Sequence, residues 1–338
     1  MKIFHHTDDD GYCSAAIVFR YLIKMYDIPT EEDFFPYSYG RNIELPELRK
    51  GEEVYIVDLA LDDNIMVLIR HCVDSEAKVI HIDHHESTLK FISKLTPSNR
   101  AYINSITHFY ETGISASLMT YAYSCFTDEQ QRNPEEVAFY DKNDCRDLFI
   151  EENTYGYSIP LAIRYINDYD IWKFALKETE EFHAGFYACP WKDRPWDEGW
   201  KNLFMSENAL VPPIIESGHS IKVYIEKTYE QIRKRAFDIH TDFGHGIFIN
   251  TDAGTSKVFG NMLKEYDFGC MFYFNGEEWK YELRSAEGKT NVADIAITFG
   301  GGGHANAAGF KCGELIPIIE DHLRKLGTGV SVISVENI

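Results

Sequence analysis

The chain has 338 residues, of which 44% are hydrophobic and 14% aromatic, enough to build the cores of two domains. Its 54 acidic and 33 basic side chains give a net charge of −21, which disfavours a protein that grips long nucleic acid through its phosphates. The seven cysteines form no CxxC pair, the N-terminus shows no secretory signal, and no run of about 18 apolar residues occurs, so we expect a cytoplasmic protein with reduced thiols and no membrane span.

The first 170 residues alternate between strand and helix patterns. Apolar runs predict strands at Lys2–His6, Glu53–Leu59 and Ala77–Ile82. Helical spacing occurs at Gly11–Tyr26 and Asp62–Val73. This order implies a parallel sheet with right-handed crossovers, in which ligands bind at the carboxyl ends of the strands.

The rest of the chain contains more helices and one clear hairpin. The further predicted helices are Ile114–Phe126, Pro134–Tyr140, Leu161–Phe174, a long connector Pro212–Ile239 begun by its proline pair, and Lys257–Tyr266. Gly246–Asn250 is strand-like, and Asn275-Gly276 joins the predicted strands Cys270–Phe274 and Trp279–Leu283 into a hairpin.

Acidic and histidine side chains collect at the ends of the three N-terminal strands. An extended turn points His6, Asp8 and Asp10 to one side, while Asp58 and the run Asp83-His84-His85 follow the other two strands. A single Asp here would be an ordinary helix cap. Three acidic strand ends that converge need counter-charge, and oxygen-rich donors with some imidazole suit Mn²⁺ or Mg²⁺.

The second landmark is Gly300–Gly309, with the sequence GGGGHANAAG. The glycine run lets backbone N–H groups approach an anion, and the alanine-rich part is expected to form a helix whose N-terminus favours negative charge. A flexible loop is the alternative. Arg284 and Ser285, at the end of the hairpin, would complete an anion site.

Together the motifs HTDDDG at 6–11, Asp58, DHH at 83–85 and GGGGHANAAG at 300–309 resemble the DHH/DHHA1 phosphoesterases over nearly the whole chain. The resemblance implies an α/β fold with an N-terminal parallel-sheet DHH domain that has helices on both faces. It also implies a linker helix and a smaller α/β DHHA1 domain with a mixed sheet. We expect these parts at residues 1–205, 206–240 and 241–338.

The resemblance also implies two divalent ions, most simply Mn²⁺, with Mg²⁺ and Co²⁺ as alternatives. One would be held by His6, Asp8 and Asp58, and the other by Asp10, Asp58, His84 and a fourth-motif aspartate. Residues 167–172 are similar to the Asp-x-Asp-x-Trp segment of the oligoribonuclease branch. The fourth aspartate is assigned to Asp168, with Asp170 as the alternative and Asp141 and Asp144 as weaker candidates.

Roles for other residues follow from the same resemblance. Asp83 would orient a histidine, and His85 would face the scissile phosphate and act in catalysis with Asp58 and His304. The expected substrate contacts are Arg284, Ser285, Gly302, Gly303 and His304.

The implied function is Mn²⁺-dependent hydrolysis of short oligonucleotides to mononucleotides by two-metal hydroxide attack. Cyclic or linear dinucleotides and adenosine bisphosphate are alternative substrates. A different alternative is an inactive nucleotide-binding regulator, although every expected ligand position is filled. The Trp-rich stretch 189–200 would either stack bases or, as we favour, form a hydrophobic cluster.

The charge pattern bears on the partner. Residues 1–200 carry a balance of −17 and the remainder only −4. Such acidity repels long duplex nucleic acid except at a metal-filled cleft, so we expect a short single-stranded oligonucleotide or dinucleotide. No membrane partner is expected, and a homodimer is left open.

Overall fold

The computed structural model describes residues 1–22, 28–132, 159–253 and 255–325. The chain divides into two units, Met1–Lys222 and Val223–Ile338, and the division falls inside the long helix α10 (Glu207–Arg233). The predicted helix Pro134–Tyr140 lies outside the described residues, as do the weaker ligand candidates Asp141 and Asp144.

The first unit is built on a five-stranded sheet in which every neighbouring pair is parallel, with the order β2-β1-β3-β4-β5. The three predicted strands form its centre. The edge strands β2 and β5 lack a clear strand pattern, because both are only four residues long and β2 contains a proline. The strand bounds are β1 Lys2–His6, β2 Phe34–Tyr37, β3 Glu53–Val57, β4 Lys78–Asp83 and β5 Thr107–Tyr110.

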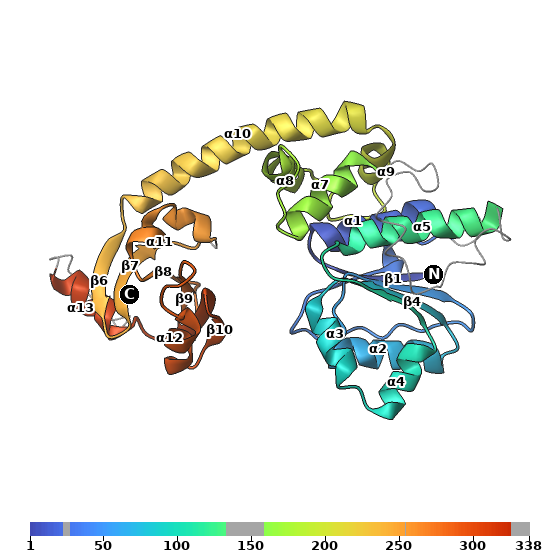
Figure 1. Ribbon diagram of the computed structural model, residues 1–338, viewed down its shortest axis with the longest axis horizontal. Helices are drawn as coiled ribbons and strands as arrows, with labels where there is room; N and C mark the ends of the chain where they lie inside the picture. Colours follow the sequence, from blue (N-terminus) through green and yellow to red (C-terminus); the bar gives the residue numbers. More distant parts are fainter. Residues whose placement is uncertain (23–27, 133–158, 254, 326–338) are drawn as a thin grey trace, which may run out of the picture. The chain divides into compact units, whose positions relative to one another are not determined.

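Helices cover both faces of this sheet (Figure 1), as predicted for the α/β fold. Successive β3 residues point to opposite faces, so Tyr55 packs with helices α1 and α5 while Val54 and Ile56 pack with α2 and α4. Both faces are therefore apolar, which explains the continuous hydrophobic run of this strand. The bounds are α1 Asp9–Ile17, the π-helical turn η1 Val18–Leu22, the 3-10 turn η2 Glu31–Asp33, α2 Asp63–Asp74, α3 Glu86–Ser93, α4 Pro97–Asn104 and α5 Ala116–Arg132.

A second core in the same unit is rich in aromatic rings. Helices α7 (Leu161–Asp170), α8 (Thr179–Tyr187) and α9 (Glu198–Met205) pack against α1 and α5 there. The prediction for α10 was wrong at both ends. The helix begins at Glu207, with the proline pair inside it, and it ends at Arg233 because Phe237–Thr241 forms strand β6.

The second unit holds a six-stranded mixed sheet with the order β10-β11-β9-β8-β7-β6, in which only β7 and β8 are parallel. The predicted hairpin is present, and Gly276 takes the positive φ of 101° that its turn requires. The strand bounds are β6 Phe237–Thr241, β7 Gly244–Asn250, β8 Phe268–Phe274, β9 Trp279–Arg284, β10 Gly302–His304 and β11 Ala307–Cys312. The helices are the 3-10 turn η4 Ser256–Phe259, α11 Met262–Glu265, α12 Val292–Thr298 and α13 Pro317–Lys325.

The alanine-rich segment after the glycine run is a strand, and the predicted helix is wrong. Residues 307–312 form β11, which pairs with β9 on one side and with the short β10 on the other. Backbone contact explains Gly301 and Gly303, since a Cβ would lie 2.2 Å from the Gly309 carbonyl oxygen at Gly301 and 2.5 Å from Ala308 Cα at Gly303. Pairing with an open sheet edge thus outweighs the helix propensity of alanine.

Among the described helices, none combines the length and the apolar character needed to cross a bilayer.

Candidate metal centre

The site lies where the neighbouring strands β1, β3 and β4 end. His6 is the last residue of β1, Asp58 follows β3 directly, and His84 follows β4. Asp58 has a φ of 57°, a left-handed backbone conformation that Asp tolerates better than most residues. The parallel order of the strands therefore brings together side chains that are far apart in the sequence.

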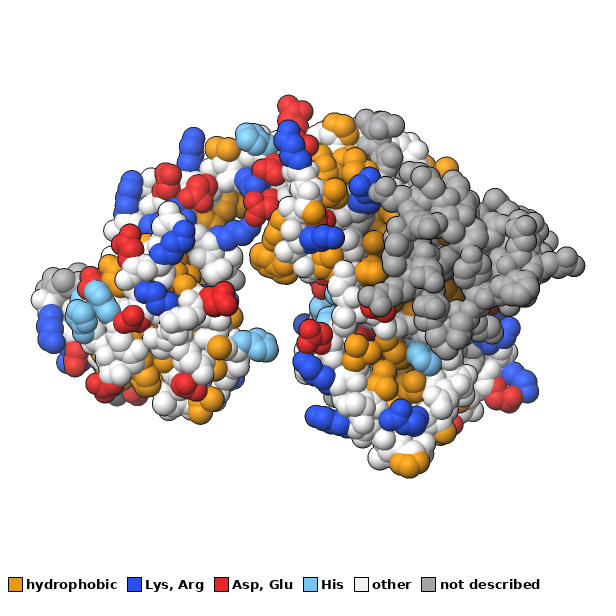
Figure 2. Space-filling view, in the orientation of Figure 1, with side chains coloured by type: hydrophobic (Ala, Val, Ile, Leu, Met, Phe, Trp, Pro, Cys, Tyr) orange, Lys and Arg blue, Asp and Glu red, His pale blue; other side chains and the backbone are white. Residues whose placement is uncertain are grey.

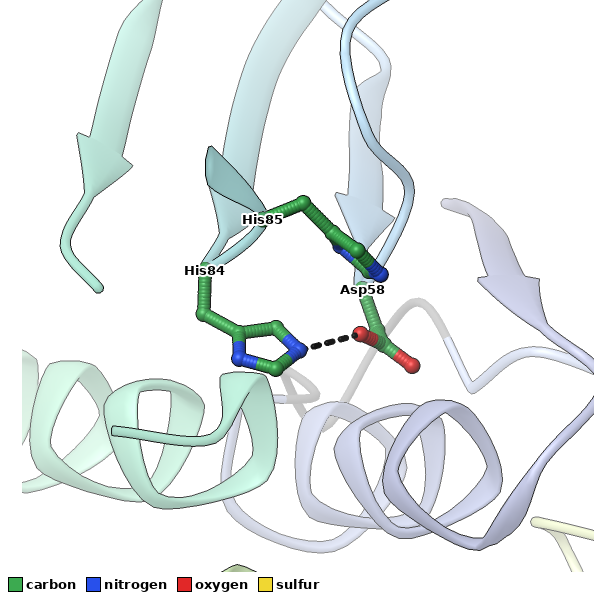
Figure 3. A group of neighbouring side chains, drawn as sticks. All are labelled: Asp58, His84 and His85. Atoms are coloured by element: carbon green, nitrogen blue, oxygen red, sulfur yellow. Dashed lines mark ion pairs between the residues drawn. The ribbon is translucent and has the colours of Figure 1, made fainter. Parts of the chain in front are cut away.

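Asp58 joins the two halves of this cluster. One oxygen, Oδ2, lies 3.8 Å from His6 Nδ1, which is itself 2.6 Å from Asp8 Oδ2. The other oxygen, Oδ1, lies 3.4 Å from His84 Nε2. Figure 3 marks this ion pair with a dashed line. The potential ligand atoms of His6, Asp8 and Asp58 all lie within 4.8 Å of one another.

A second group shares His84. Its Nε2 atom is 3.9 Å from Asp10 Oδ2 and 3.5 Å from Asp170 Oδ2. Asp10 is fixed by the start of helix α5, because its two oxygens accept the N–H groups of Ala116 at 2.7 Å and Ser117 at 2.9 Å. These N–H groups have no partner within the helix, so the acidic side chain caps it.

The electrostatics of the cluster call for added positive charge. The Asp58 side chain is 1% exposed, and neither oxygen accepts a hydrogen bond from the described part of the chain. Burial and the nearby charges of Asp10 and Asp8 raise the pKa of Asp58 well above its usual range. Burial and Asp10 likewise raise the pKa of Asp170, whose Oδ2 is also buried without a hydrogen-bond partner among the described residues. These donors suit a divalent cation.

The structure brings Asp170 to this cluster and not Asp168. Asp168 and Asp170 both lie on helix α7 with one residue between them. Their side chains therefore point in different directions. The Asp168 carboxylate accepts the N–H groups of Ala175 at 2.8 Å and Leu176 at 3.0 Å, together with the Thr179 hydroxyl at 2.5 Å. Asp168 therefore anchors the segment that links α7 to α8.

Asp83 holds His85 in place through a hydrogen bond between the two side chains. Its oxygens accept His85 Nδ1 at 2.7 Å and the Thr88 hydroxyl at 2.5 Å. Burial raises the pKa of Asp83, but the hydrogen bond and charge of His85 outweigh it and leave the pKa below its usual value. In Figure 3 the His85 side chain extends toward Asp58. The potential ligand atoms of Asp58, His84 and His85 form a third group within 4.8 Å of one another.

The predicted substrate contacts lie in the second unit. His304 on β10 pairs with Ala307, which in turn pairs with Arg284 on β9, so the two basic side chains share one row across the sheet. Ser285 follows directly and donates its hydroxyl to the Ala305 carbonyl at 3.4 Å. Gly302 has open space where a Cβ would lie, whereas a Cβ on Gly303 would lie 2.5 Å from Ala308 Cα.

The Trp-rich stretch forms the hydrophobic cluster that we favoured. Trp200 is fully buried and packs on Trp191 with 5.6 Å between ring centroids, while Trp196 contacts Phe34 on the sheet. Lys192 is held by two carboxylates of the first unit. Its amine is 3.1 Å from Asp9 Oδ1 and 2.6 Å from Asp193 Oδ1.

The sequence reasoning missed two features. One is an exposed aromatic pair, Trp172 and Tyr187, beside the acidic cluster. Trp172 stood in the segment 167–172 that resembles a family motif, but its sequence did not reveal that the side chain is exposed. The other feature is a group of potential ligands in the second unit, Asp238, His240 and His245, which cross-strand pairing of β6 and β7 brings together.

Residues 1–143 match the model of the DHH family, N-terminal domain. The uncharacterized protein R106 of Acanthamoeba polyphaga mimivirus is 22% identical over 323 residues, which cover 91% of this chain and 66% of that protein, just under two thirds of its length. RecJ of Thermus thermophilus, solved in complex with Mn²⁺, has a TM-score of 0.50 at 15% identity, over 97% of this chain and 52% of that one. The DHH domain of a member of a family of ribosomal proteins has a TM-score of 0.52 at 15% identity, over 96% and 85% of the two chains. At these identities the likeness to solved structures concerns the fold alone.

Proposed function

The chain belongs to the DHH family through its N-terminal domain, and from this premise we propose that it is a metal-dependent phosphodiesterase that hydrolyses short oligonucleotides to mononucleotides. The observation that carries the proposal is the Asp58 carboxylate, which is buried between two groups of ligands and has no hydrogen-bond partner among the described residues. A buried carboxylate among others of its kind is strongly disfavoured unless cations neutralise it.

We assign two divalent ions to this cluster. His6, Asp8 and Asp58 would hold one of them. Asp10, Asp58, His84 and Asp170 would hold the other, with Asp170 in place of Asp168. Divalent ions bound there would supply an activated water and stabilise the negative charge that develops on a phosphate. The Mn²⁺ in RecJ supports manganese as the first ion to test.

The remaining residues have roles in binding and in holding charge. His85, oriented by Asp83, would donate a hydrogen bond to a phosphate oxygen. In the second unit Arg284, Ser285, Gly302, Gly303 and His304 would bind another phosphate of the substrate. The row that joins Arg284 to His304 supports this role, because it places two cationic or hydrogen-bonding side chains on one strip of the sheet.

The charge distribution favours short substrates. Lys, Arg, Asp and Glu side chains are interspersed on the face seen in Figure 2, and the described residues visible there form no continuous basic strip. Long nucleic acid needs such a strip to release its counterions. A dinucleotide or short oligomer needs only a few contacts at the metal site. We therefore propose these over long strands, with cyclic dinucleotides and adenosine bisphosphate as alternatives.

The test is incubation of the protein with labelled RNA of two to five nucleotides, in Mn²⁺ and in excess chelator. We expect mononucleotide release only with Mn²⁺. Parallel reactions with cyclic dinucleotides and adenosine bisphosphate rank the alternative substrates. If no substrate is cleaved but nucleotide still binds, the protein is a nucleotide-binding regulator and the enzymatic proposal is wrong.

A further inference from the structure

A cavity of about 360 Å³ lies directly beside the acidic cluster, within the first unit. This volume is in the range of ordinary small-molecule sites. One part of its wall is acidic and includes Asp8, Asp10 and Asp170, and another part is aromatic and includes Tyr169, Trp172 and Tyr187. A molecule in this cavity would thus contact aromatic rings and the proposed metal ligands together.

Two of these rings are largely exposed. Trp172 is 66% exposed and Tyr187 is 72% exposed, although each ring has a large apolar surface. Aromatic side chains of this size are normally packed in a core or at an interface. At the wall of a cavity, such rings can stack on a ligand with a flat, apolar face.

The backbone holds Trp172 in this position at a cost. Its φ is 53°, and that of Phe174 is 48°, a conformation unfavourable for bulky side chains. Asp168 maintains this turn through two parts of the residue. Its side-chain carboxylate accepts the N–H groups of Ala175 and Leu176. Its backbone carbonyl oxygen accepts the N–H group of Lys173 at 3.0 Å. Strain that is retained by dedicated hydrogen bonds is typical of functional positions.

The cavity also has polar groups within its wall. The His183 ring stacks on Tyr169 at 3.5 Å, and its Nδ1 lies 3.0 Å from Asp9 Oδ2. The Lys192 amine is 3.1 Å from Asp9 Oδ1 and lies over the Tyr187 ring at 5.3 Å. A ligand between these groups would meet hydrogen-bonding edges as well as aromatic faces. This combination fits a heterocyclic ring better than an alkyl chain.

We infer that this cavity binds a nucleobase of the substrate, with Trp172 and Tyr187 as stacking surfaces. The inference rests on the proposed function, since the acidic wall would hold the ions that bind the adjoining phosphate. Stacking uses the π-face that all bases share, so the site would accept any base. A hydrophobic segment of a protein partner is the competing occupant, and the absence of base-dependent binding would favour it.

The experiment measures binding of AMP and of ribose 5-phosphate to the full chain with Mn²⁺ present, by titration calorimetry. Ribose 5-phosphate carries a hydroxyl where AMP carries its base, and the phosphate is the same. We expect AMP to bind about tenfold or more tightly, and Trp172→Ala or Tyr187→Ala to remove most of that difference. Trp172→Phe should restore part of it. Tyr224→Ala is the matched control, because Tyr224 is 71% exposed on helix α10 and should leave the ratio unchanged.

Equal affinity for the two ligands in the wild-type protein would overturn the inference, as would an unchanged ratio in both alanine variants. The proposed function can fail separately. If no phosphodiester is cleaved but AMP binding still depends on its base and on Trp172, the pocket is correct and the enzymatic proposal is wrong. If diesters are cleaved while AMP and ribose 5-phosphate bind equally, the enzymatic proposal stands and the pocket is wrong.

Discussion

Asp58 Oδ1 lies 3.4 Å from His84 Nε2, so the ends of strands β3 and β4 meet at one buried carboxylate. The opposite oxygen of Asp58 faces His6, at the end of β1. Three strand ends thus converge on a side chain that lacks a hydrogen-bond donor within the described chain. This relationship makes Asp58 the natural shared ligand of two cations and the first residue to test.

Replacing Asp58 should have opposite effects with and without metal. In the metal-free protein we expect Asp58→Asn to raise the melting temperature. Burial and the charges of Asp10 and Asp8 disfavour ionisation of Asp58 in the folded state, and at neutral pH this costs stability that the neutral amide does not. With Mn²⁺ present, the variant should lose the metal-induced stabilisation of the wild type. Thermal unfolding in chelator and in Mn²⁺ measures both effects. A variant that is destabilised in chelator would contradict this account of the cluster.

Asp170 and Asp168 should separate metal binding from folding. Asp170→Asn is expected to weaken binding of one ion by about 100-fold or more, since even residues that only support ligands cost about 10–100-fold when mutated. Asp168→Ala should instead destabilise the fold by about 3 kcal/mol, because it leaves the N–H groups of Ala175 and Leu176 without their acceptor and removes one of the two acceptors of the Thr179 hydroxyl.

Calorimetric titration with Mn²⁺ and urea unfolding of the metal-free protein distinguish these two effects. Asp62→Ala is a matched control for the loss of a carboxylate that accepts a backbone N–H group. Asp62 caps helix α2 by accepting the Ile65 N–H group, and it lies outside the metal cluster. It should lower stability by about 1 kcal/mol and leave the metal affinity unchanged. A loss of metal affinity in Asp168→Ala, with Asp170→Asn unaffected, would reverse the assignment.

Metal uptake should release protons. In the folded protein without metal, burial and Asp10 raise the pKa of Asp170 to about 9, so this carboxyl binds a proton at neutral pH that Mn²⁺ must displace. The pKa of Asp58 is also raised well above its usual range, which acts in the same direction. Mn²⁺ affinity should therefore rise with pH through the neutral range. Groups with raised pKa values also favour the folded state at low pH, and this contribution is lost as the pH rises through the raised values. Calorimetry in buffers of different ionisation enthalpy measures the protons released, and a count of zero near neutral pH would contradict the raised pKa values.

Each chain should bind two ions at the cluster where strands β1, β3 and β4 end. The exposed group Asp238, His240 and His245 is a separate set of potential ligands that would add a weak ion to any count. We therefore expect His240→Ala to leave two tight Mn²⁺ ions per chain and the hydrolytic activity intact. Metal analysis after dialysis checks this. Retention of fewer than two tight ions by this variant would contradict the assignment of both to the first unit.

Much of the fold follows from local sequence patterns. The run Glu53–Val57 is apolar on both faces, and the hairpin at Gly276 has the residues its turn demands. The alanine-rich segment at 307–312 was mispredicted because its preference for helix is weak and an open sheet edge decides its structure. The helix Pro212–Ile239 was extended too far because helical composition continues into strand β6.

The site was also predictable in part. His6, Asp8, Asp10, Asp58 and His84 stand in spaced motifs at strand ends, so parallel topology alone suggests that they meet. The choice between Asp168 and Asp170 depended on the rotation of helix α7, which sequence spacing does not define. Exposure of Trp172 depended in turn on a strained turn after that helix.

The most direct test of the central claim is the rate of Mn²⁺-dependent mononucleotide release from a labelled RNA dinucleotide by the wild-type protein and by Asp58→Asn. In the variant the metal ions should no longer stabilise the transition state, a loss of several kcal/mol that should lower the rate by at least about a thousandfold. Folding of the variant is verified by its thermal transition in chelator. Comparable hydrolysis by both proteins, or none by the wild type with Mn²⁺, would contradict a metal-dependent phosphodiesterase centred on Asp58.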